Sequence, residues 1–275
     1  MKKITIFAIF LAALTLGFQG IGTAQVLLNE NFDYPAGDNI SAHGWTSHSG
    51  GGTQPITVAA TGLTFPGYLD SGIGMAALLD NNGEDDNKQF GVQTTGTIYT
   101  SFMVKVTTSA FGYFLHLGGD PISTVFRGKV FMNATNHFGV SVGNNVGTFA
   151  AATYTPGTTY TLVLKYQIVA GTNNDIISLF IFDSGMPYVE PAPTIGPLTD
   201  ATMTDIAPAT VALRQFIATQ NITVDGIRVG KTWADVAGVQ PVPTLSEWGL
   251  ILLGVALAGI GAFYIMRRRN SELSV

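Results

Sequence analysis

Acidic and amide side chains recur at every second position between residues 80 and 86. Asp80, Asn82, Glu84 and Asp86 could present oxygen ligands at a spacing that wraps around a calcium ion. The segment is not an EF-hand, because Asp85 stands at the sixth position, where glycine is needed, and no glutamate follows at the twelfth. The pattern therefore predicts either a calcium loop or a polar hairpin turn.

Residues suited to acid–base catalysis are sparse. The segment between the two apolar ends of the chain has three glutamates, and the whole chain has four histidines and no HExxH motif. We predict no catalytic residue. Two of the histidines, His43 and His48, flank Trp45 in a segment rich in glycine and serine. This arrangement predicts either a ligand-binding loop tip or an ordinary solvated loop.

Five side chains on expected strands could form a carbohydrate-binding face. Sugar recognition needs aromatic rings for stacking and planar hydrogen-bonding groups beside them. The alternative is an ordinary solvated sheet face. The candidate residues are Tyr99, His116, Arg127, Lys129 and Arg214.

The elements that must position these residues are short strands. From residue 26 onward, β-branched and aromatic runs are separated by Gly, Asn, Asp and Pro, which is typical of a sandwich or barrel. Residues 102–106 and 159–166 alternate in polarity, so we expect half-solvated antiparallel strands there. Residues 176–182 are apolar on both faces, which predicts a strand buried on both sides.

About a dozen strands in one domain predict two packed sheets. A segment with five prolines, residues 184–208, is expected to be a long surface connection. We expect strands near residues 26–33, 56–64, 75–80, 88–93, 97–107, 112–118, 125–132, 137–143, 159–169, 175–183, 209–216 and 221–229.

The composition limits the classes of partner. The chain has 275 residues, of which 46% are hydrophobic and 11% charged. Between Val26 and Gly238 there are 16 acidic and 8 basic residues, a balance of 8 − 16 = −8, which argues against a nucleic-acid partner. There is no cysteine, so the domain must be held together by its core alone.

Both ends of the chain look like targeting segments. Residues 1–24 have two lysines, an apolar run and small residues before Gln25, which predicts a cleaved signal peptide. Residues 249–266 form an uncharged apolar run that could cross a membrane as a helix, after a linker at 239–248. The arginines of the basic tail, residues 267–275, place this end in the cytoplasm and the long middle segment, residues 25–238, outside.

The segment around the apolar run resembles the IPTL-CTERM family of bacterial sorting signals. The resemblance implies export to the cell envelope of a Gram-negative bacterium, with processing by an exosortase-like or other sorting protease. The alternative is a retained single-pass membrane anchor. Val242 stands where the family usually has Ile. The residues that carry the motif are Pro243, Thr244, Leu245, Ser246, Glu247, Trp248, Gly249, Arg267, Arg268 and Arg269.

The middle segment resembles concanavalin A-like jelly rolls, the lectin/glucanase and laminin-G-like superfamily. Residues 29–34 and 224–229 look like the first and last strands of that fold, and the rest is similar to a module of secreted Bacteroidetes-type proteins. The resemblance implies an all-β, two-sheet antiparallel jelly-roll sandwich whose terminal strands pair. It also implies a structural calcium site from Glu30 or Asp33 with Asp225. A glucanase of this fold would need a Glu-x-Asp-x-Glu strand, which the sequence lacks.

These patterns predict an exported, non-catalytic protein of the cell envelope or matrix that binds extracellular polysaccharide or acts in adhesion. No cofactor is required, although Ca²⁺ is a candidate ligand at the two acidic segments. The alternative is a glycan-active hydrolase or lyase on the same fold.

Overall fold

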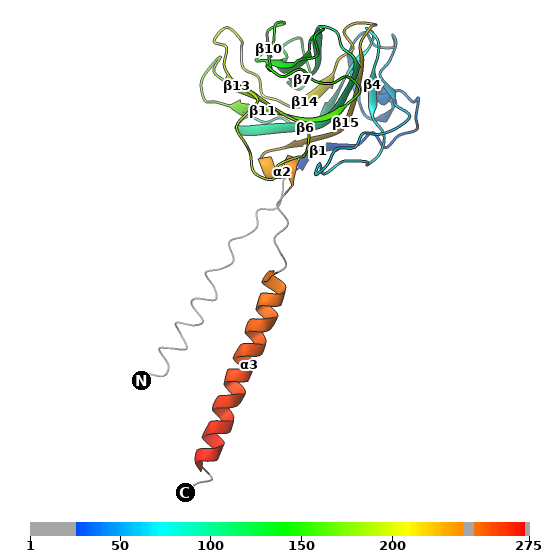
Figure 1. The fold of residues 1–275 in the computed structure, drawn as a ribbon. Coiled ribbons are helices and arrows are strands. Elements are labelled where there is room, and N and C mark those ends of the chain that lie inside the picture. Colours follow the sequence, from blue (N-terminus) through cyan, green and yellow to red (C-terminus); the bar gives the residue numbers. More distant parts are fainter. Residues whose placement is uncertain (1–25, 239–244, 273–275) are drawn as a thin grey trace. The chain divides into compact units, whose positions relative to one another are not determined.

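The computed structural model describes residues 26–238 and 245–272, which fall into two units divided after Gly238 (Figure 1). The predicted signal peptide, residues 1–24, lies outside the described residues, as do Pro243 and Thr244 of the sorting motif. The first unit is an all-β domain, and the second contains the helix α3 (Leu245–Glu272). Each unit is described by itself.

Helix α3 begins within the sorting motif and includes the three arginines, 267–269, in its backbone. Its side chains are described for residues 249–264. Among the residues that the structure describes, no helix is long and apolar enough to cross a membrane. A span needs about 20 apolar residues. The predicted transmembrane helix at 249–266 is therefore not supported.

The all-β domain consists of two antiparallel sheets, as the sequence predicts. Sheet A contains, in spatial order, β13 (Ile195–Leu198), β12 (Ile176–Phe182), β11 (Thr159–Ile168), β6 (Gly96–Thr108), β15 (Asn221–Gly230), β4 (Ala77–Leu79) and β3 (Thr57–Val58), and β1 (Val26–Glu30) also pairs with β15. Sheet B contains β10 (Thr148–Phe149), β9 (Phe138–Ser141), β8 (Arg127–Met132), β7 (Gly112–Gly118), β14 (Thr210–Leu213), β5 (Asp85–Gln89) and β2 (Thr46–Ser49). This architecture is consistent with a concanavalin A-like jelly roll.

The terminal strands of the domain pair, as the resemblance implies. Strand β1 runs antiparallel to β15, with Asn29 opposite Arg228 and Glu30 opposite Ile227. The other edge of β15 pairs with β6, and a bulge interrupts that pairing between Asp225 and Arg228. Gly226 lies in the bulge at φ +58°, where a side chain would be strained and its Cβ would come within 3.0 Å of the Tyr68 ring.

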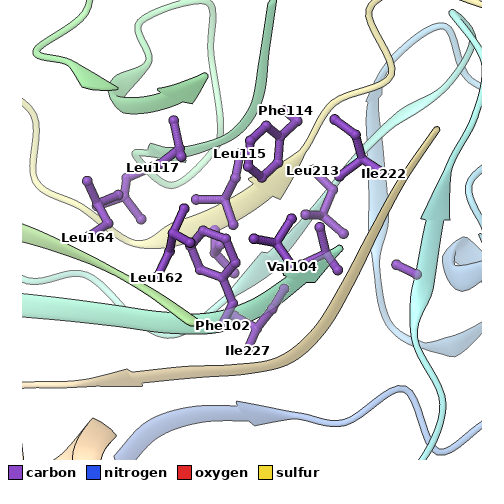
Figure 2. Packing of buried hydrophobic residues seen from close by; sticks show 14 of the residues in the cluster. Phe102, Val104, Phe114, Leu115, Leu117, Leu162, Leu164, Leu213, Ile222 and Ile227 are labelled. Carbon is purple, nitrogen blue, oxygen red and sulfur yellow. The ribbon is translucent and has the colours of Figure 1, made fainter. Parts of the chain in front are cut away.

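The main hydrophobic core lies between the two sheets. Figure 2 shows side chains of β7 and β14, from sheet B, packed with side chains of β6, β11 and β15, from sheet A. Alternate strand positions supply this layer, because successive side chains point to opposite faces. Fully buried members include Phe102, Val104, Leu115, Leu117, Leu162, Leu164, Leu213 and Ile227.

A second apolar cluster covers the outer face of sheet A. Helix α2 (Trp233–Ala237) places Trp233 at 5.0 Å from the Phe180 ring and 6.0 Å from the Tyr99 ring, centroid to centroid. Met103 and Val163 are fully buried in this cluster. The prediction of half-solvated strands at 102–106 and 159–166 is thus wrong, because a covering layer hides the middle of both strands. Strand β12 is buried on both sides, as expected.

The twelve expected strands all appear, with shifted ends. The largest differences are at β3, which ends at Val58 and not at 64, and at β5, which covers Asp85–Gln89 and not 88–93. Three short strands were not expected: β2, β10 and β13. Strand β13 contains Gly196 and Pro197 within the presumed surface connection, and β10 has only two residues, so neither has a detectable strand pattern. Such strands exist because their neighbours supply the hydrogen bonds.

Candidate functional site

Three of the predicted sugar-binding residues lie together on the outer face of sheet B. Leu115 and Leu117 point into the core, so His116 between them points outward. Lys129 precedes the core residue Val130 on β8, and Arg214 follows the core residue Leu213 at the end of β14. Strands β14, β7 and β8 are neighbours in the sheet, and they bring these three side chains to one surface.

Tyr113, at the start of β7, holds the two cations together. The Lys129 Nζ lies over the Tyr113 ring, 4.6 Å from its centroid, and the Arg214 Cζ lies over the same ring at 4.3 Å. A cation over an aromatic face is attracted by the ring quadrupole. The ring therefore offsets part of the repulsion between the two positive groups.

Tyr113 and Arg214 also line a cavity of about 260 Å³. Its walls are mostly aromatic, with polar groups from Arg214 and Asn145. Phe111 lies at this cavity and is 53% exposed, and the centroid of its ring is 6.2 Å from that of Phe131. The lining residues are Phe111, Gly112, Tyr113, Phe131, Asn145, Arg214 and Phe216, and we call this site, together with Lys129, the sheet B pocket.

The charges of the sheet B pocket are poorly compensated. Burial, together with the charges of Arg214 and Arg127, lowers the pKa of Lys129 to about 8. Its Nζ donates to the neutral Asn145 Oδ1 at 2.9 Å. The nearest carboxylate to Arg214 is Asp85, with Oδ2 at 3.8 Å from Nε. Burial raises the pKa of Asp85 to about 6, partly opposed by the Gln215 backbone N–H and by Arg214.

Two histidines lie beside the pocket on the same face. His116 is fully buried, and its ring is 4.0 Å from the Phe126 ring and 5.6 Å from that of His48, centroid to centroid. Within the described residues, neither ring nitrogen of His116 has a hydrogen-bond partner. Burial lowers the pKa of His48 to about 4 and that of His116 well below its usual value. Both rings are therefore neutral at neutral pH.

The other two predicted sugar-binding residues lie elsewhere. Tyr99 is on sheet A, where its hydroxyl donates to Glu190 Oε2 at 2.7 Å. Arg127 is on β8, but its Nε donates to the Thr204 carbonyl at 2.6 Å and its Nη1 to the Phe126 carbonyl at 2.7 Å. Both side chains are thus engaged in contacts away from the sheet B pocket.

Sequence reasoning missed the aromatic part of the site. Phe111 and Tyr113 precede and begin an expected strand at a spacing of two, which places them on one side of the chain. That spacing was a usable signal. Phe216 and Asn145 come from segments after β14 and β9, and nothing in their local sequence links them to β7.

The four-residue acidic segment does not converge on one point. Glu84 and Asp86 are buried, whereas Asp80 and Asn82 are exposed. The Asn81 backbone N–H donates to the Gln215 side chain at 3.0 Å, as in a polar turn. No group of three or more His, Cys, Asp or Glu side chains that could hold a metal ion occurs in the described part of the chain.

The side chains of the second candidate calcium site, Glu30 or Asp33 with Asp225, also have separate contacts. Glu30 accepts from the Phe32 N–H at 2.7 Å and forms an ion pair with Lys88. Asp225 accepts from the Leu63 N–H at 2.7 Å. Asp33 is exposed. These carboxylates are held by protein donors or solvent and do not form a joint ligand set.

Carboxylates and serines that could suggest hydrolysis lie outside the pocket. Asp86 pairs in register with the core residue Leu213, so it and Glu84 face the inside of sheet B. A GxSxG pattern occurs at residues 139–143, but it lies in and just after β9 and not at a strand-to-helix turn. The Ser141 hydroxyl in it donates to the Asn144 carbonyl at 2.7 Å.

Comparison with known proteins gives one sequence match. The IPTL-CTERM motif matches residues 240–269. No curated protein matches the chain. The motif confirms the predicted sorting signal and supports export to the cell envelope through C-terminal sorting.

Solved structures resemble the fold at low identity. The endo-1,3-beta-glucanase from Streptomyces sioyaensis has a TM-score of 0.48 and 12% identity, covering 76% of this chain and 97% of that one. The globular domain of T. cruzi calreticulin has a TM-score of 0.44 and 10% identity over 88% and 99% of the two chains. An alginate lyase variant in complex with alginate tetrasaccharide has a TM-score of 0.43 and 14% identity, covering 74% of this chain and 96% of that one. These scores carry no argument about function, and the chain is placed by its own features as a two-sheet β-sandwich with an IPTL-CTERM motif.

Proposed function

We propose that this chain is an exported, non-catalytic protein of the cell envelope that binds glycan at the sheet B pocket. The observation that carries the proposal is the combination of an exposed aromatic residue, Phe111, with Tyr113, Arg214 and Asn145 around one cavity. Aromatic faces stack on the apolar faces of sugar rings, and guanidinium and amide groups hydrogen-bond to hydroxyls. This site offers both kinds of contact.

Retention on immobilised polysaccharides tests this proposal. Protein purified from the envelope of cells that express it should bind at least one glycan without releasing reducing ends or unsaturated products. A Phe216→Ala variant should bind more weakly, because it removes one aromatic wall of the pocket. Absence of retention on a broad panel of neutral and acidic glycans would contradict the proposal.

A lyase is the second candidate, and one observation favours it. A general base works best when its pKa lies near the working pH. The pKa of Lys129 is lowered to about 8 beside Tyr113, so Lys129 could accept a proton from a sugar ring carbon next to a carboxylate. The electron pair of that C–H bond would form a double bond to the neighbouring ring carbon, and the glycosidic oxygen on that carbon would leave and take a proton from water. Unsaturated products that disappear in the Lys129→Met variant would establish the lyase and reject the non-catalytic function.

Processing at the C-terminus is the second part of the proposed function. The motif at residues 240–269 supports recognition by an exosortase-type enzyme. We expect cleavage close to Pro243, Thr244 and Leu245, which would release the β-domain from α3. Mass spectrometry of the mature surface form decides this point. A mature form that still contains residues 250–269 would indicate a retained segment.

A further inference from the structure

The charge of the sheet B pocket indicates which glycans it takes. We propose that the ligand is an anionic glycan, with a carboxylate or sulfate group bound by Arg214 and Lys129 beside the Tyr113 ring. This inference rests on the proposed glycan-binding function and narrows it to one ligand class. It is carried by the position of two cations over a single aromatic ring, 4.6 Å and 4.3 Å from its centroid.

The two cations have less counter-charge than they need. Within the described residues, Lys129 forms no ion pair with a carboxylate, and its hydrogen-bond acceptor is the neutral Asn145. Arg214 has one carboxylate, Asp85, at 3.8 Å, and that carboxylate also accepts from the Gln215 N–H. Two cations and one carboxylate leave an excess of one positive charge in the pocket.

Burial makes this excess costly in the free protein. Lys129 is only 7% exposed, so water screens it poorly. The mutual repulsion with Arg214 and Arg127 appears in the lowered pKa of Lys129. The neighbouring His48 and His116 are neutral and add no further positive charge. A bound anion would relieve this repulsion, so the energy stored in the pocket favours an acidic ligand over a neutral one.

The two cations of the sheet B pocket belong to a domain in which acidic side chains outnumber basic ones. Residues 26–238 carry twice as many acidic as basic side chains. A polyanion is therefore repelled by the domain as a whole and gains attraction only where cations are concentrated. Binding of an acidic glycan should depend on these two side chains and not on a general basic surface.

Two matched pairs of polysaccharides test the inference. The first pair is polygalacturonate and its methyl ester, which share a backbone and differ in charge. The second pair is dextran sulfate and dextran. Protein purified from the envelope should bind polygalacturonate or dextran sulfate roughly tenfold more tightly than the uncharged partner, because a hydrogen bond to a charged group is stronger than one between neutral groups. Which acidic polymer binds distinguishes a carboxylate from a sulfate ligand.

Substitutions assign the effect to the pocket. Arg214→Gln and Lys129→Met should each abolish most of the preference for the acidic polymer, so binding of the acidic polymer should fall much further than binding of its uncharged partner. Lys105→Met is the matched control, since it removes the same charge from sheet A. Because Lys129 is buried, thermal melting must accompany that variant. Arg214 has 29% of its side chain exposed and can be replaced with less risk to folding.

The outcomes separate the two proposals. Equal binding of the charged and uncharged polymers, or an acidic preference that survives Arg214→Gln, would overturn the anionic ligand and leave glycan binding standing. Absence of binding to all four polymers would overturn the anionic ligand, and absence of retention on the broad glycan panel as well would overturn both.

Discussion

Lys88 on sheet B donates a hydrogen bond to the carboxylate of Glu30 on sheet A, and this ion pair joins the two layers of the sandwich. Glu30 is 4% exposed and also accepts from Trp45 Nε1 at 3.2 Å and from the Tyr34 hydroxyl at 2.9 Å. The carboxylate is thus surrounded by donors. Burial lowers the pKa of Lys88, but the contacts with Glu30 and Tyr34 outweigh it and raise that pKa.

Replacing Lys88 should destabilise the domain markedly. Lys88→Met leaves the Glu30 carboxylate buried without its cation, and breaking a buried pair in this way costs about 3 kcal/mol. The remaining donors to Glu30 reduce the loss to about 2 kcal/mol. Lys165→Met is the control, because its partner Glu190 is 29% exposed and such pairs contribute about 1 kcal/mol or less. Urea unfolding measures both, and equal losses would contradict the prediction.

The Glu30 contacts show what the sequence could predict. The resemblance to concanavalin A-like jelly rolls implied a calcium site that included Glu30, since carboxylates favour that ion. The partner of Glu30, Lys88, lies 58 residues away, and the pairing depends on the stacking of two sheets. No local pattern contains that information. The pairing of β1 with β15 was predictable only through the resemblance to a known fold.

Rising pH should destabilise the domain through Asp86. Burial, followed by the charge and hydrogen bond of Glu84, raises the pKa of Asp86 to about 7. An unfolded aspartate has a pKa of about 3.9. Between these values the native state holds a proton that the unfolded state releases. The stabilisation is therefore complete below about pH 4 and is lost as the pH rises through 7.

An Asp86→Asn variant tests this pH dependence. The amide cannot ionise. Between pH 5 and pH 8, the free energy of unfolding should therefore fall by on the order of 2 kcal/mol less in the variant than in the parent. Burial also raises the pKa of Asp225 to about 7. Because Asp225 remains in the variant, part of the decrease of stability with pH should remain too. Asp33→Asn, at an exposed carboxylate, is the control. Parallel stability curves for Asp86→Asn and the parent would show that Asp86 is not responsible.

The aromatic wall of the sheet B pocket gives a separate prediction for binding. Phe111 is 53% exposed, so Phe111→Ser should change stability by less than about 1 kcal/mol. Loss of its stacking face should weaken glycan binding about threefold to tenfold. Val189→Ser, at a residue 75% exposed and outside the pocket, is the matched control. Unchanged affinity in Phe111→Ser, measured by titration calorimetry, would remove Phe111 from the site.

The sequence predicted the strands better than the site. Hydrophobic alternation located the long strands β6, β11, β12 and β15, because their core faces are regular. The same alternation wrongly predicted that the opposite faces of β6 and β11 are exposed to solvent. Helix α2, which helps to cover the face of sheet A, has only five residues and leaves no periodic pattern in the sequence. Lys129 and Arg214 were recognised as polar strand positions. Their common contact, Tyr113, was not, because it depends on which strands become neighbours.

The end of the β-domain provides the last prediction, which concerns stability without α3. The core clusters draw on residues 32–237, and the contacts of the described chain divide after Gly238. A chain of residues 26–238 should therefore melt cooperatively, without any disulfide. A chain that ends at Gly230 is the informative comparison, because it lacks α2.

Helix α2 begins with a capping box, in which Thr232 and Asp235 each accept a hydrogen bond from the other's backbone N–H. Removing it would expose the Phe180 and Met103 side chains that Trp233 and Val236 help to cover. Loss of a buried Trp alone costs about 3–5 kcal/mol. The chain ending at Gly230 should thus melt at a much lower temperature than the chain ending at Gly238. Similar melting temperatures would show that α2 does not stabilise sheet A, and a non-cooperative transition of residues 26–238 would show that the β-domain needs the segment that follows it.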